Sequence, residues 1–284
     1  MPAAVVVAGE GVLGLTELIE LKLLARFVEL GWVLALVLGL EIGFPRERHP
    51  LAARLAAAVF WSVSAAFAVV FSTLFGMAWE ALDIKPLFHA GGWMPQPVAY
   101  VAGPLLGALI GDFFYWAHRA QHTFFWRFHS IHHSIRHLSA LSSYHHWTEE
   151  AFRTLLIVIP SSLLVDLQVG PAMPLIVGFL LVHGIYFHSS SRLHFGPFGR
   201  VLVDNRYHRV HHSIEPMHFD KNFAAFTPMW DVVFGTYYFP KPGEWPQTGV
   251  SDQPEPTEIL DYLVRPFETQ PPVTGLSAGT PPGS

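Results

Sequence analysis

Residues 55–79 read LAAAVFWSVSAAFAVVFSTLFGMAW, a stretch of 25 residues without a charged side chain. As an α-helix it would extend for about 37 Å, more than the roughly 30 Å of a bilayer's hydrocarbon core. The whole chain agrees with this pattern, because 51% of its 284 residues are hydrophobic and only 14% are charged. Soluble domains usually carry about 25% charged residues. The sequence therefore predicts an integral membrane protein and argues against a soluble globular one.

Two further apolar stretches flank this segment. The first spans residues 27–44, carries Glu29 and Glu41, and ends before Pro45. It is interpreted as a transmembrane helix, with a partly buried interfacial helix as the alternative. The other runs over residues 97–110 and continues into the aromatic residues that follow. Three glutamates and no basic region precede the first span, so we expect no cleaved signal peptide.

A fourth apolar region covers residues 154–187 and is interrupted near its middle by Gly170, Pro171 and Pro174. Each arm is short for a full crossing of the bilayer. We predict a helical hairpin that enters the membrane and returns to the same side. Two thin spanning helices joined by a short loop are the alternative, with the same topology. The expected fold class is thus an all-α integral membrane protein with about three transmembrane helices, a helical hairpin and a cytoplasmic histidine-rich helical cap.

Arginines predict the orientation of the chain. Two groups of them are separated by two spans and therefore lie on the same side. They are Arg46, Arg48 and Arg54 before the second span, and Arg119, Arg127, Arg136 and Arg153 after the third. The positive-inside rule makes that side cytoplasmic. The net charge of −5 provides no basic patch for nucleic acid.

The histidines are the second unusual feature. There are 17 of them, as many as lysine and arginine together, and 15 lie between residues 118 and 218. One H-x-x-x-H motif and two H-x-x-H-H motifs contain His118, His122, His129, His132, His133, His208, His211 and His212. Spacings of three and four place side chains on one face of a helix. One such motif is as often structural as metal-binding, but three in order at a membrane boundary favour a site for two metal ions.

The residue types limit the kind of metal site. There is no cysteine, so no thiolate ligand is possible. The first motif reads His118-Arg-Ala-Gln-His122 and lacks the glutamate of an H-E-x-x-H zinc protease. Glu215-x-x-His218 matches the ferritin-like pattern once, but Pro216 interrupts it. Neutral imidazoles without thiolates fit two non-haem irons, although spacing does not separate iron from zinc or copper. A membrane zinc hydrolase and a non-enzymatic metal-binding or transport protein remain alternatives.

Several segments resemble the fatty acid hydroxylase/sterol desaturase superfamily of membrane histidine-cluster di-iron oxygenases. They are residues 112–122, 129–133, 208–212, 220–223 and 230–236, and the resemblance covers about residues 98–239. It implies a membrane enzyme with two iron ions that uses O₂ to hydroxylate or desaturate a lipid of sterol-like, fatty-acyl or ether-lipid type. The two electrons would come from a separate carrier, either a ferredoxin or a cytochrome b5-like protein with its reductase. The lipid would enter from the bilayer between the apolar spans.

The resemblance also assigns roles to individual residues. It makes the eight motif histidines iron ligands and adds His188, after the hairpin, as a ninth. The segment Tyr144–Glu149 matches the family's Arg-x-His-Pro-x-Glu stretch only at His146 and Glu149, which weakens any assignment to the fatty-acid or sterol branches. The candidates for groups that support the ligands are Asp112, His146, Glu149, Asn222 and Asp231.

The supporting residues are interpreted in different ways. Asp112 is expected either to accept a hydrogen bond from a ligand histidine or to act as a cap or a partner of Arg119. Asn222 and Asp231 are expected to order the loop behind the site. Four other histidines are interpreted as neighbours or hydrogen-bond partners of the ligands, namely His137, His145, His183 and His194. His49, His89 and His218 are interpreted as unrelated to the metals.

The expected organisation has three parts. Residues 1–96 form N-terminal membrane helices, residues 97–239 form a hydroxylase-like catalytic domain, and residues 240–284 form a proline-rich, extended or disordered tail without chemistry. Ten of the 23 prolines lie in that tail. An acidic electron carrier could dock on a surface formed by Arg119, Arg127, Arg136 and Arg209, although a solvated or headgroup-facing role fits these arginines equally well.

Overall fold

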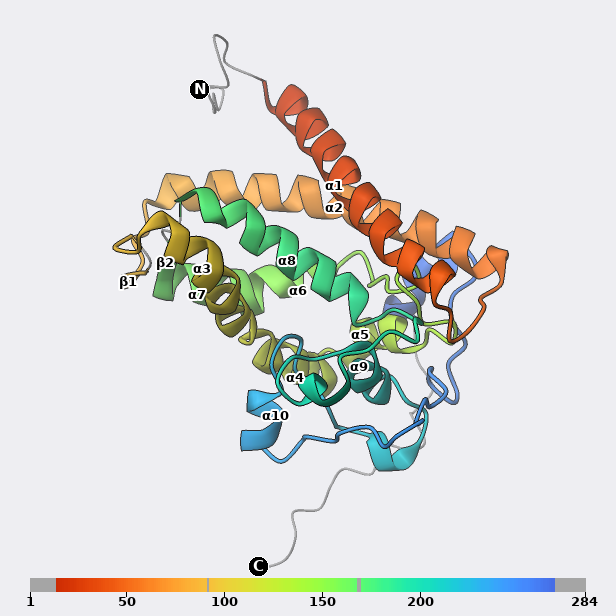
Figure 1. Cartoon of the computed structure of the whole chain (residues 1–284). Coiled ribbons are helices and arrows are strands. Elements are labelled where there is room, and N and C mark those ends of the chain that lie inside the picture. The colour runs from red at the N-terminus through yellow and green to blue at the C-terminus, as the bar shows by residue number, and fades with distance from the viewer. Residues whose placement is uncertain (1–13, 91, 168–169, 269–284) are drawn as a thin grey trace, which may run out of the picture.

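The computed structural model describes residues 14–90, 92–167 and 170–268 (Figure 1). Three helical stretches in it are long and apolar enough to cross a membrane. They are α1 (Leu15–Gly43), α2 (Leu51–Leu82) and the combined stretch Gln96–Phe124, which consists of α3 (Gln96–Gly111) and α4 (Phe114–Phe124). The long helices gather in the upper part of Figure 1, and the short helices α4, α5 (Trp126–His133), α9 (Asn205–His211) and α10 (Met229–Val233) lie below them.

The first helix begins earlier than the apolar pattern predicts. It starts at Leu15, while the predicted apolar stretch starts at Phe27. The intervening residues include five leucines, two glutamates and one lysine, which all favour helix without requiring burial. The helix therefore extends beyond its most apolar part. The region expected to lack a signal peptide includes residues 1–13, which lie outside the described residues.

The hairpin region is helical in both arms but not uniformly so. The first arm consists of α6 (Glu149–Arg153), a π-helical turn (Thr154–Val158) and α7 (Ile159–Leu164), and the second arm is α8 (Met173–Tyr186). Between the arms lie a short strand, β2 (Val165–Leu167), and a 3₁₀ turn (Gly170–Ala172).

A pair of parallel strands departs from the all-α expectation. Strand β1 (Phe88–Ala90) pairs with β2, with Phe88 opposite Val165. The backbone N–H of Leu87 also donates to the carbonyl of Leu163, at 2.9 Å. Extended backbone lacks internal hydrogen bonds, so these two connecting segments pair with each other to satisfy their polar groups. Three-residue strands are too short to produce a recognisable sequence pattern.

Small residues let the third helix approach the hairpin closely. Gly103 and Gly107 of α3 face Ile176 of α8, and a Cβ atom at position 107 would lie 2.4 Å from the Ile176 Cγ2 atom. At Gly111 the ring of Phe226 fills the corresponding space, 2.7 Å from where a Cβ atom would lie. Such spacing of small residues is how apolar helices pack tightly in membranes. It holds α8 against α3, and Phe226 against the end of α3.

A buried carboxylate joins the first helix to two loops. Glu41 of α1 is 2% exposed, and its Oε1 atom accepts hydrogen bonds from the backbone N–H groups of Ala140 (2.8 Å) and Ser190 (2.7 Å). The charge that interrupts the first apolar stretch therefore serves the fold. It holds the loops that follow α5 and α8 next to one another.

The proline-rich segment from residue 240 onward, predicted to be extended or disordered, contains helical turns and packs on the rest of the fold as far as residue 268. It includes α11 (Ile259–Val264) and a 3₁₀ turn (Arg265–Phe267). Tyr262 is fully buried, stacks on Phe60 of α2 with ring centroids 4.5 Å apart, and hydrogen-bonds the carbonyl of His145 at 2.8 Å. Periodicity cannot reveal such a segment, because specific side chains rather than a repeating apolar face hold it in place. Residues 269–284 lie outside the described part.

Candidate metal centre

Nine histidines from four parts of the chain meet in two groups. Helices α4, α5 and α9 supply most of them, and His188 comes from the segment directly after α8. The first group is His118, His122, His129, His133 and His211, and the second is His132, His188, His208 and His212. In each group one nitrogen of every imidazole lies within 4.8 Å of the others. These are the same nine residues that the motifs and the family resemblance identified.

Local signals place α9 and its histidines. Asp204 precedes the helix in extended conformation, and its Oδ1 atom accepts hydrogen bonds from the backbone N–H groups of Arg206 (3.1 Å) and Tyr207 (3.0 Å). This is an N-cap, which satisfies donors that a helix start otherwise leaves unpaired. Because His208 and His211 lie within this helix, the cap fixes one histidine of each group.

The Nε2 atoms converge closely in the first group. The Nε2 atom of His118 lies 3.0 Å from that of His129 and 3.0 Å from that of His211. The Nε2 atom of His133 lies 3.2 Å from that of His211 and 3.1 Å from that of His122. Two nitrogens bound at right angles to one metal ion at about 2.1 Å would themselves be about 3 Å apart. The observed spacing therefore suits a shared cation.

The second group shows the same convergence. The Nε2 atom of His188 lies 3.2 Å from that of His132 and 3.0 Å from that of His208. The Nε2 atom of His212 lies 3.1 Å from that of His208. Each group thus presents several ring nitrogens towards one point.

Backbone carbonyls set the orientation of four of these rings. In the first group, the Nδ1–H of His118 donates to the carbonyl of Phe223 and that of His211 to the carbonyl of Lys221, both at 2.8 Å. A carbonyl oxygen can only accept, so in each neutral ring Nδ1 carries the proton and Nε2 carries the lone pair. Two lone pairs facing each other at 3.0 Å repel unless a cation lies between them. The donor set therefore fits a metal ion.

The same reasoning applies to the second group. The Nδ1–H of His132 donates to the carbonyl of Tyr144 at 3.0 Å, and that of His188 donates to the carbonyl of Gly184 at 2.9 Å. Their Nε2 lone pairs then face each other at 3.2 Å. Hydrogen bonds of this kind, on the far nitrogen of a ligating histidine, are how proteins orient metal ligands.

Burial keeps these imidazoles neutral. Desolvation is the main cause that lowers the pKa of His188 to about 3 and that of His211 to about 4. It also lowers the pKa of the histidines of α5 and of His208 and His212 well below the usual range. Neutral imidazole is the form that binds metals. The site is therefore in its metal-binding protonation state at neutral pH.

The loop behind the first group is held by a buried carboxylate. Asp231 accepts hydrogen bonds from the backbone N–H groups of Phe223 (2.9 Å) and Ala224 (2.8 Å) and from the hydroxyl of Tyr207 (2.9 Å). Asn222 has a positive φ of 59° and donates to the carbonyl of Tyr207 at 3.0 Å. Together they position the Phe223 carbonyl that orients His118.

Asp112 has a different partner from those expected. Its carboxylate accepts from the backbone N–H of Thr227 at 3.0 Å and from the Thr227 hydroxyl. Arg119 instead donates to the hydroxyl of Tyr115 at 3.1 Å. Asp112 therefore anchors Thr227, which directly follows the loop of residues 220–226 (the 220s loop), and no hydrogen bond described here joins it to a histidine of the two groups or to Arg119. The partner lies 115 residues further along the chain, so local spacing could not reveal it.

In the segment 144–149 the neighbouring histidine lies closer to the centre than the expected one. The ring of His145 stacks on His132 with centroids 3.8 Å apart and an angle of 13° between the rings. His146 instead points to the C-terminal segment, where its Nε2–H donates to the carbonyl of Leu263 at 3.3 Å and its Nδ1 accepts from the Thr148 hydroxyl at 2.7 Å. The family pattern matches His146. It gives no indication of His145, which precedes His146 by one position.

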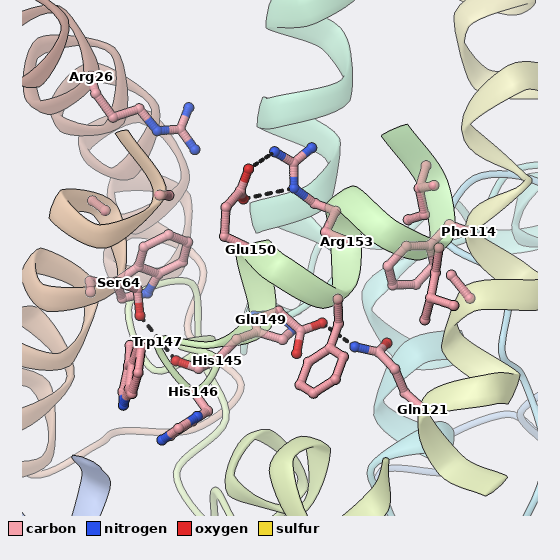
Figure 2. A pocket seen from close by; sticks show the side chains of 17 residues that line it. Arg26, Ser64, Phe114, Gln121, His145, His146, Trp147, Glu149, Glu150 and Arg153 are labelled. Atoms are coloured by element: carbon pink, nitrogen blue, oxygen red, sulfur yellow. Dashed lines mark hydrogen bonds and ion pairs between the residues drawn. The ribbon is translucent and has the colours of Figure 1, made fainter. Parts of the chain in front are cut away.

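Glu149 lies beside α4, the helix that carries His118 and His122. Its hydrogen-bond partner there is not a histidine of the two groups. Its carboxylate accepts a hydrogen bond from the side chain of Gln121, which lies on α4 between two of those histidines (Figure 2). Both residues line a cavity of about 210 Å³ together with Phe114 and His145. Withdrawal from water raises the pKa of Glu149 to about 7.

The remaining histidines lie outside the two groups. His183 donates through Nε2 to the carbonyl of Val203 at 2.8 Å, and His137 hydrogen-bonds Glu255 at 2.6 Å. His218 lies 2.9 Å from the Ser213 hydroxyl. Each of these three rings therefore has a hydrogen-bonding role in the fold.

A larger cavity lies between the histidines and the apolar helices α2 and α8. It has a volume of about 600 Å³, and His118, His132, His188 and His208 form part of its wall. Apolar side chains of α2 and α8, including Val69, Val177, Leu180 and Leu181, form another part. An apolar chain placed in this cavity would lie next to histidines of both groups.

One of the arginines considered for docking is not available for it. Arg209 is 3% exposed, donates to the carbonyl of Pro246 at 2.7 Å, and pairs with Glu47 at 2.8 Å. Burial against Trp245, with the guanidinium 4.3 Å from the ring, accounts for its position. Its role is to attach the C-terminal segment to α9.

Comparison with known proteins shows similarity to lipid-modifying hydroxylases and monooxygenases. Residues 104–236 match the family model described as fatty acid hydroxylase. The chain is 29% identical over 126 residues to an alkylglycerol monooxygenase of Danio rerio, covering 44% of this chain and 28% of that protein. It is 28% identical over 209 residues to the ornithine lipid hydroxylase OlsE of Rhizobium tropici, covering 70% of this chain and 61% of that protein.

A third relative is an alkylglycerol monooxygenase of Caenorhabditis elegans, 32% identical over 136 residues that cover 44% of this chain and 25% of that protein. The matched regions thus span between a quarter and about three fifths of these relatives. No solved structure shows significant similarity to this chain. The matched region contains all nine histidines of the two groups, so the part of the chain that resembles the fatty acid hydroxylase family is the part that carries the candidate metal centre.

Proposed function

We propose that this chain is a membrane di-iron monooxygenase that hydroxylates a lipid, using O₂ and two electrons from a separate carrier protein. The observation that carries the proposal is the pair of histidine groups with converging Nε2 lone pairs beside a cavity with apolar walls. The relatives are lipid-modifying monooxygenases and hydroxylases, which favours hydroxylation over desaturation.

The two histidine groups would each hold one iron ion. The first would use His118, His122, His129, His133 and His211, and the second His132, His188, His208 and His212. When bound, the irons would supply the activation of O₂ and the oxidation of an unactivated C–H bond. The chain's own part is to hold the imidazoles neutral, to orient their Nε2 atoms through the carbonyls, and to align the lipid beside them.

The cavity would align the substrate. Val177, Leu180 and Leu181 of α8 provide an apolar surface for a hydrocarbon chain and exclude water from the reacting carbon. Phe187 and Phe226 lie in the same wall near the histidines. The names of the relatives point to two kinds of lipid, an alkylglycerol and an ornithine lipid.

The membrane topology forms part of the proposal. Residues 1–96 would anchor the enzyme, residues 97–239 would form its catalytic part, and the arginines that flank α2 and α4 would lie in the cytoplasm. The site would then face a soluble electron carrier, a ferredoxin or a cytochrome b5-like protein with its reductase. The carrier would approach from the face formed by the short histidine-bearing helices.

The test is lipid oxidation in a host supplied with an electron-donor system. Total lipids are compared by mass spectrometry among strains that express the wild type, His132→Ala, His211→Ala, or the control His194→Ala, whose ring lies outside both groups. We expect lipids heavier by one oxygen atom with the wild type and the control only, and only in air. Identical lipid profiles in all strains would contradict the proposal. Oxygen-independent turnover by a zinc-containing protein would support a hydrolase instead.

A further inference from the structure

Four charged side chains form part of the wall of the larger cavity. Arg26 and Glu29 come from α1, and Glu150 and Arg153 come from α6. Arg26 donates to Glu29 at 2.8 Å, and the Nε atom of Arg153 donates to Glu150 at 2.9 Å. Figure 2 shows Arg26 reaching from α1 towards the helix that carries the Glu150–Arg153 pair. We call these four residues the charged wall.

The charged wall lies where charged side chains are uncommon. Arg26 and Glu29 lie within a helix that is long and apolar enough to cross a membrane. Charged residues in such helices are costly and commonly mark a substrate pathway. They add little to stability when they only pair with each other. None of the four belongs to either histidine group, so metal binding does not account for them.

The geometry leaves polar atoms available to a ligand. The side chain of Arg153 is 50% exposed and that of Arg26 is 35% exposed, while the side chain of Glu150 is only 11% exposed. Each guanidinium has five N–H donors in a planar fork, more than one carboxylate can accept. A ligand carboxylate or phosphate can therefore bind an arginine while the glutamates remain in place. The glutamate oxygens can in turn accept from an ammonium group.

The balance of charges indicates what kind of group fits. Two cations and two anions share one cavity, so a ligand with a single charge would meet repulsion as well as attraction. A neutral hydroxyl headgroup would gain little from replacing charge-assisted hydrogen bonds. A headgroup with both signs of charge can pair with an arginine and a glutamate at once.

We propose that the charged wall is the headgroup site for a zwitterionic lipid, one that carries an ammonium group together with a carboxylate or a phosphate. This proposal rests on the function proposed above, because the site lines the same cavity as the histidines. It selects a zwitterionic lipid over a neutral ether lipid as substrate.

Binding of matched probe lipids to the purified full chain in detergent micelles tests this inference. Four probes share one acyl or alkyl chain length: hexadecanoyl-lysine is zwitterionic, its methyl ester is cationic, hexadecanoyl-norleucine is anionic, and hexadecylglycerol is neutral. A lysophosphatidylethanolamine of the same length distinguishes phosphate from carboxylate. We expect one of the two zwitterions to bind at least about 10-fold more tightly than the three other probes.

Single substitutions then assign the charges. Arg153→Gln and Arg26→Gln should weaken binding of probes with an anionic group by about 10- to 100-fold, and Glu150→Gln should do so for probes with an ammonium group. None of these three changes should affect the binding of hexadecylglycerol. Lys22→Gln is the matched control, since Lys22 lies one turn from Arg26 on the same helix but does not line the cavity. Glu29→Gln provides a second glutamate variant if Glu150→Gln does not fold.

The outcomes separate this inference from the proposed function. Equal affinities for all probes, or equal losses for all probes in the variants, would overturn the charged-wall proposal even if lipid oxidation is observed. Selective binding of a zwitterion would support it even in a protein that oxidises no lipid. In a protein that turns over, the arginine variants should raise KM for the zwitterion with little change in kcat.

Discussion

The two histidine groups differ in how they relate to the rest of the molecule. Three members of the second group, His132, His188 and His208, line the large cavity, whereas His118 is the only member of the first group that does. The carbonyls behind the first group belong to the 220s loop, which Asp231 holds. Those behind the second group belong to the segment after α5 and to α8. The first group is thus supported by the 220s loop, of which only Ala225 and Phe226 reach the cavity, and the second by the segment after α5 and by α8, which contributes more of the cavity wall.

This difference predicts distinct effects of losing one ligand from each group. His132→Ala and His211→Ala should both abolish lipid oxidation, a loss of at least about 1000-fold, because the reaction needs both metal ions. Only His132→Ala should also change the affinity for a bound lipid, since its ring lines the cavity and that of His211 does not. Turnover assays and equilibrium lipid binding measure the two effects separately. Unequal losses of turnover, with one variant still active, would show that one group is dispensable.

Asp231→Asn should affect the first group alone. The change places an amide NH₂ where the carboxylate accepts from Phe223 and Ala224, and so disturbs the carbonyl that orients His118. Loss of such supporting contacts typically weakens metal binding about 10- to 100-fold. Chelator titration of the loaded protein should show one ion released earlier and the other unchanged. An equal loss of affinity for both ions would mean that the 220s loop supports the whole centre.

The carboxyl group of Glu149 should make the stability of the fold depend on pH. Its folded-state pKa of about 7 lies above the ordinary value of 4.5, so the folded state favours the protonated carboxyl. Ionisation of this group therefore costs stability as pH rises from about 4.5 through 7, and the full cost is present above 7. Glu149→Gln should raise the melting temperature at pH 8 and leave it nearly unchanged at pH 5. The opposite order would show that the carboxylate form stabilises the fold.

The smallest effect is expected at His145. Its ring stacks on His132 of the second group but has no place in either set of converging nitrogens. His145→Ala should remove this stacking contact, worth about 1 kcal/mol, and lower the affinity for the second ion several-fold at most. His146→Ala is the matched control and should leave both ions in place. A loss of one whole ion in His145→Ala would instead make His145 a ligand.

Much of the candidate site could be predicted from the sequence, because the information is local. Spacings of three and four residues identify His118 with His122 and His208 with His211, and hydropathy identifies α2. The residues that support the centre could not be found in this way. The acceptors of His118 and His132 are backbone carbonyls, which every residue has, and the partner of Asp112 is distant in the chain. The order of the C-terminal segment likewise depends on tertiary contacts such as that of Tyr262 with Phe60.

The most direct measurement is the metal content of the purified protein, determined for the wild type, His132→Ala and His211→Ala after loading with ferrous iron under anaerobic conditions. We predict two irons per chain in the wild type and one in each variant, with zinc and copper absent from protein isolated without added metal. One iron or none in the wild type, or stoichiometric zinc in active protein, would contradict a di-iron centre held by these nine histidines.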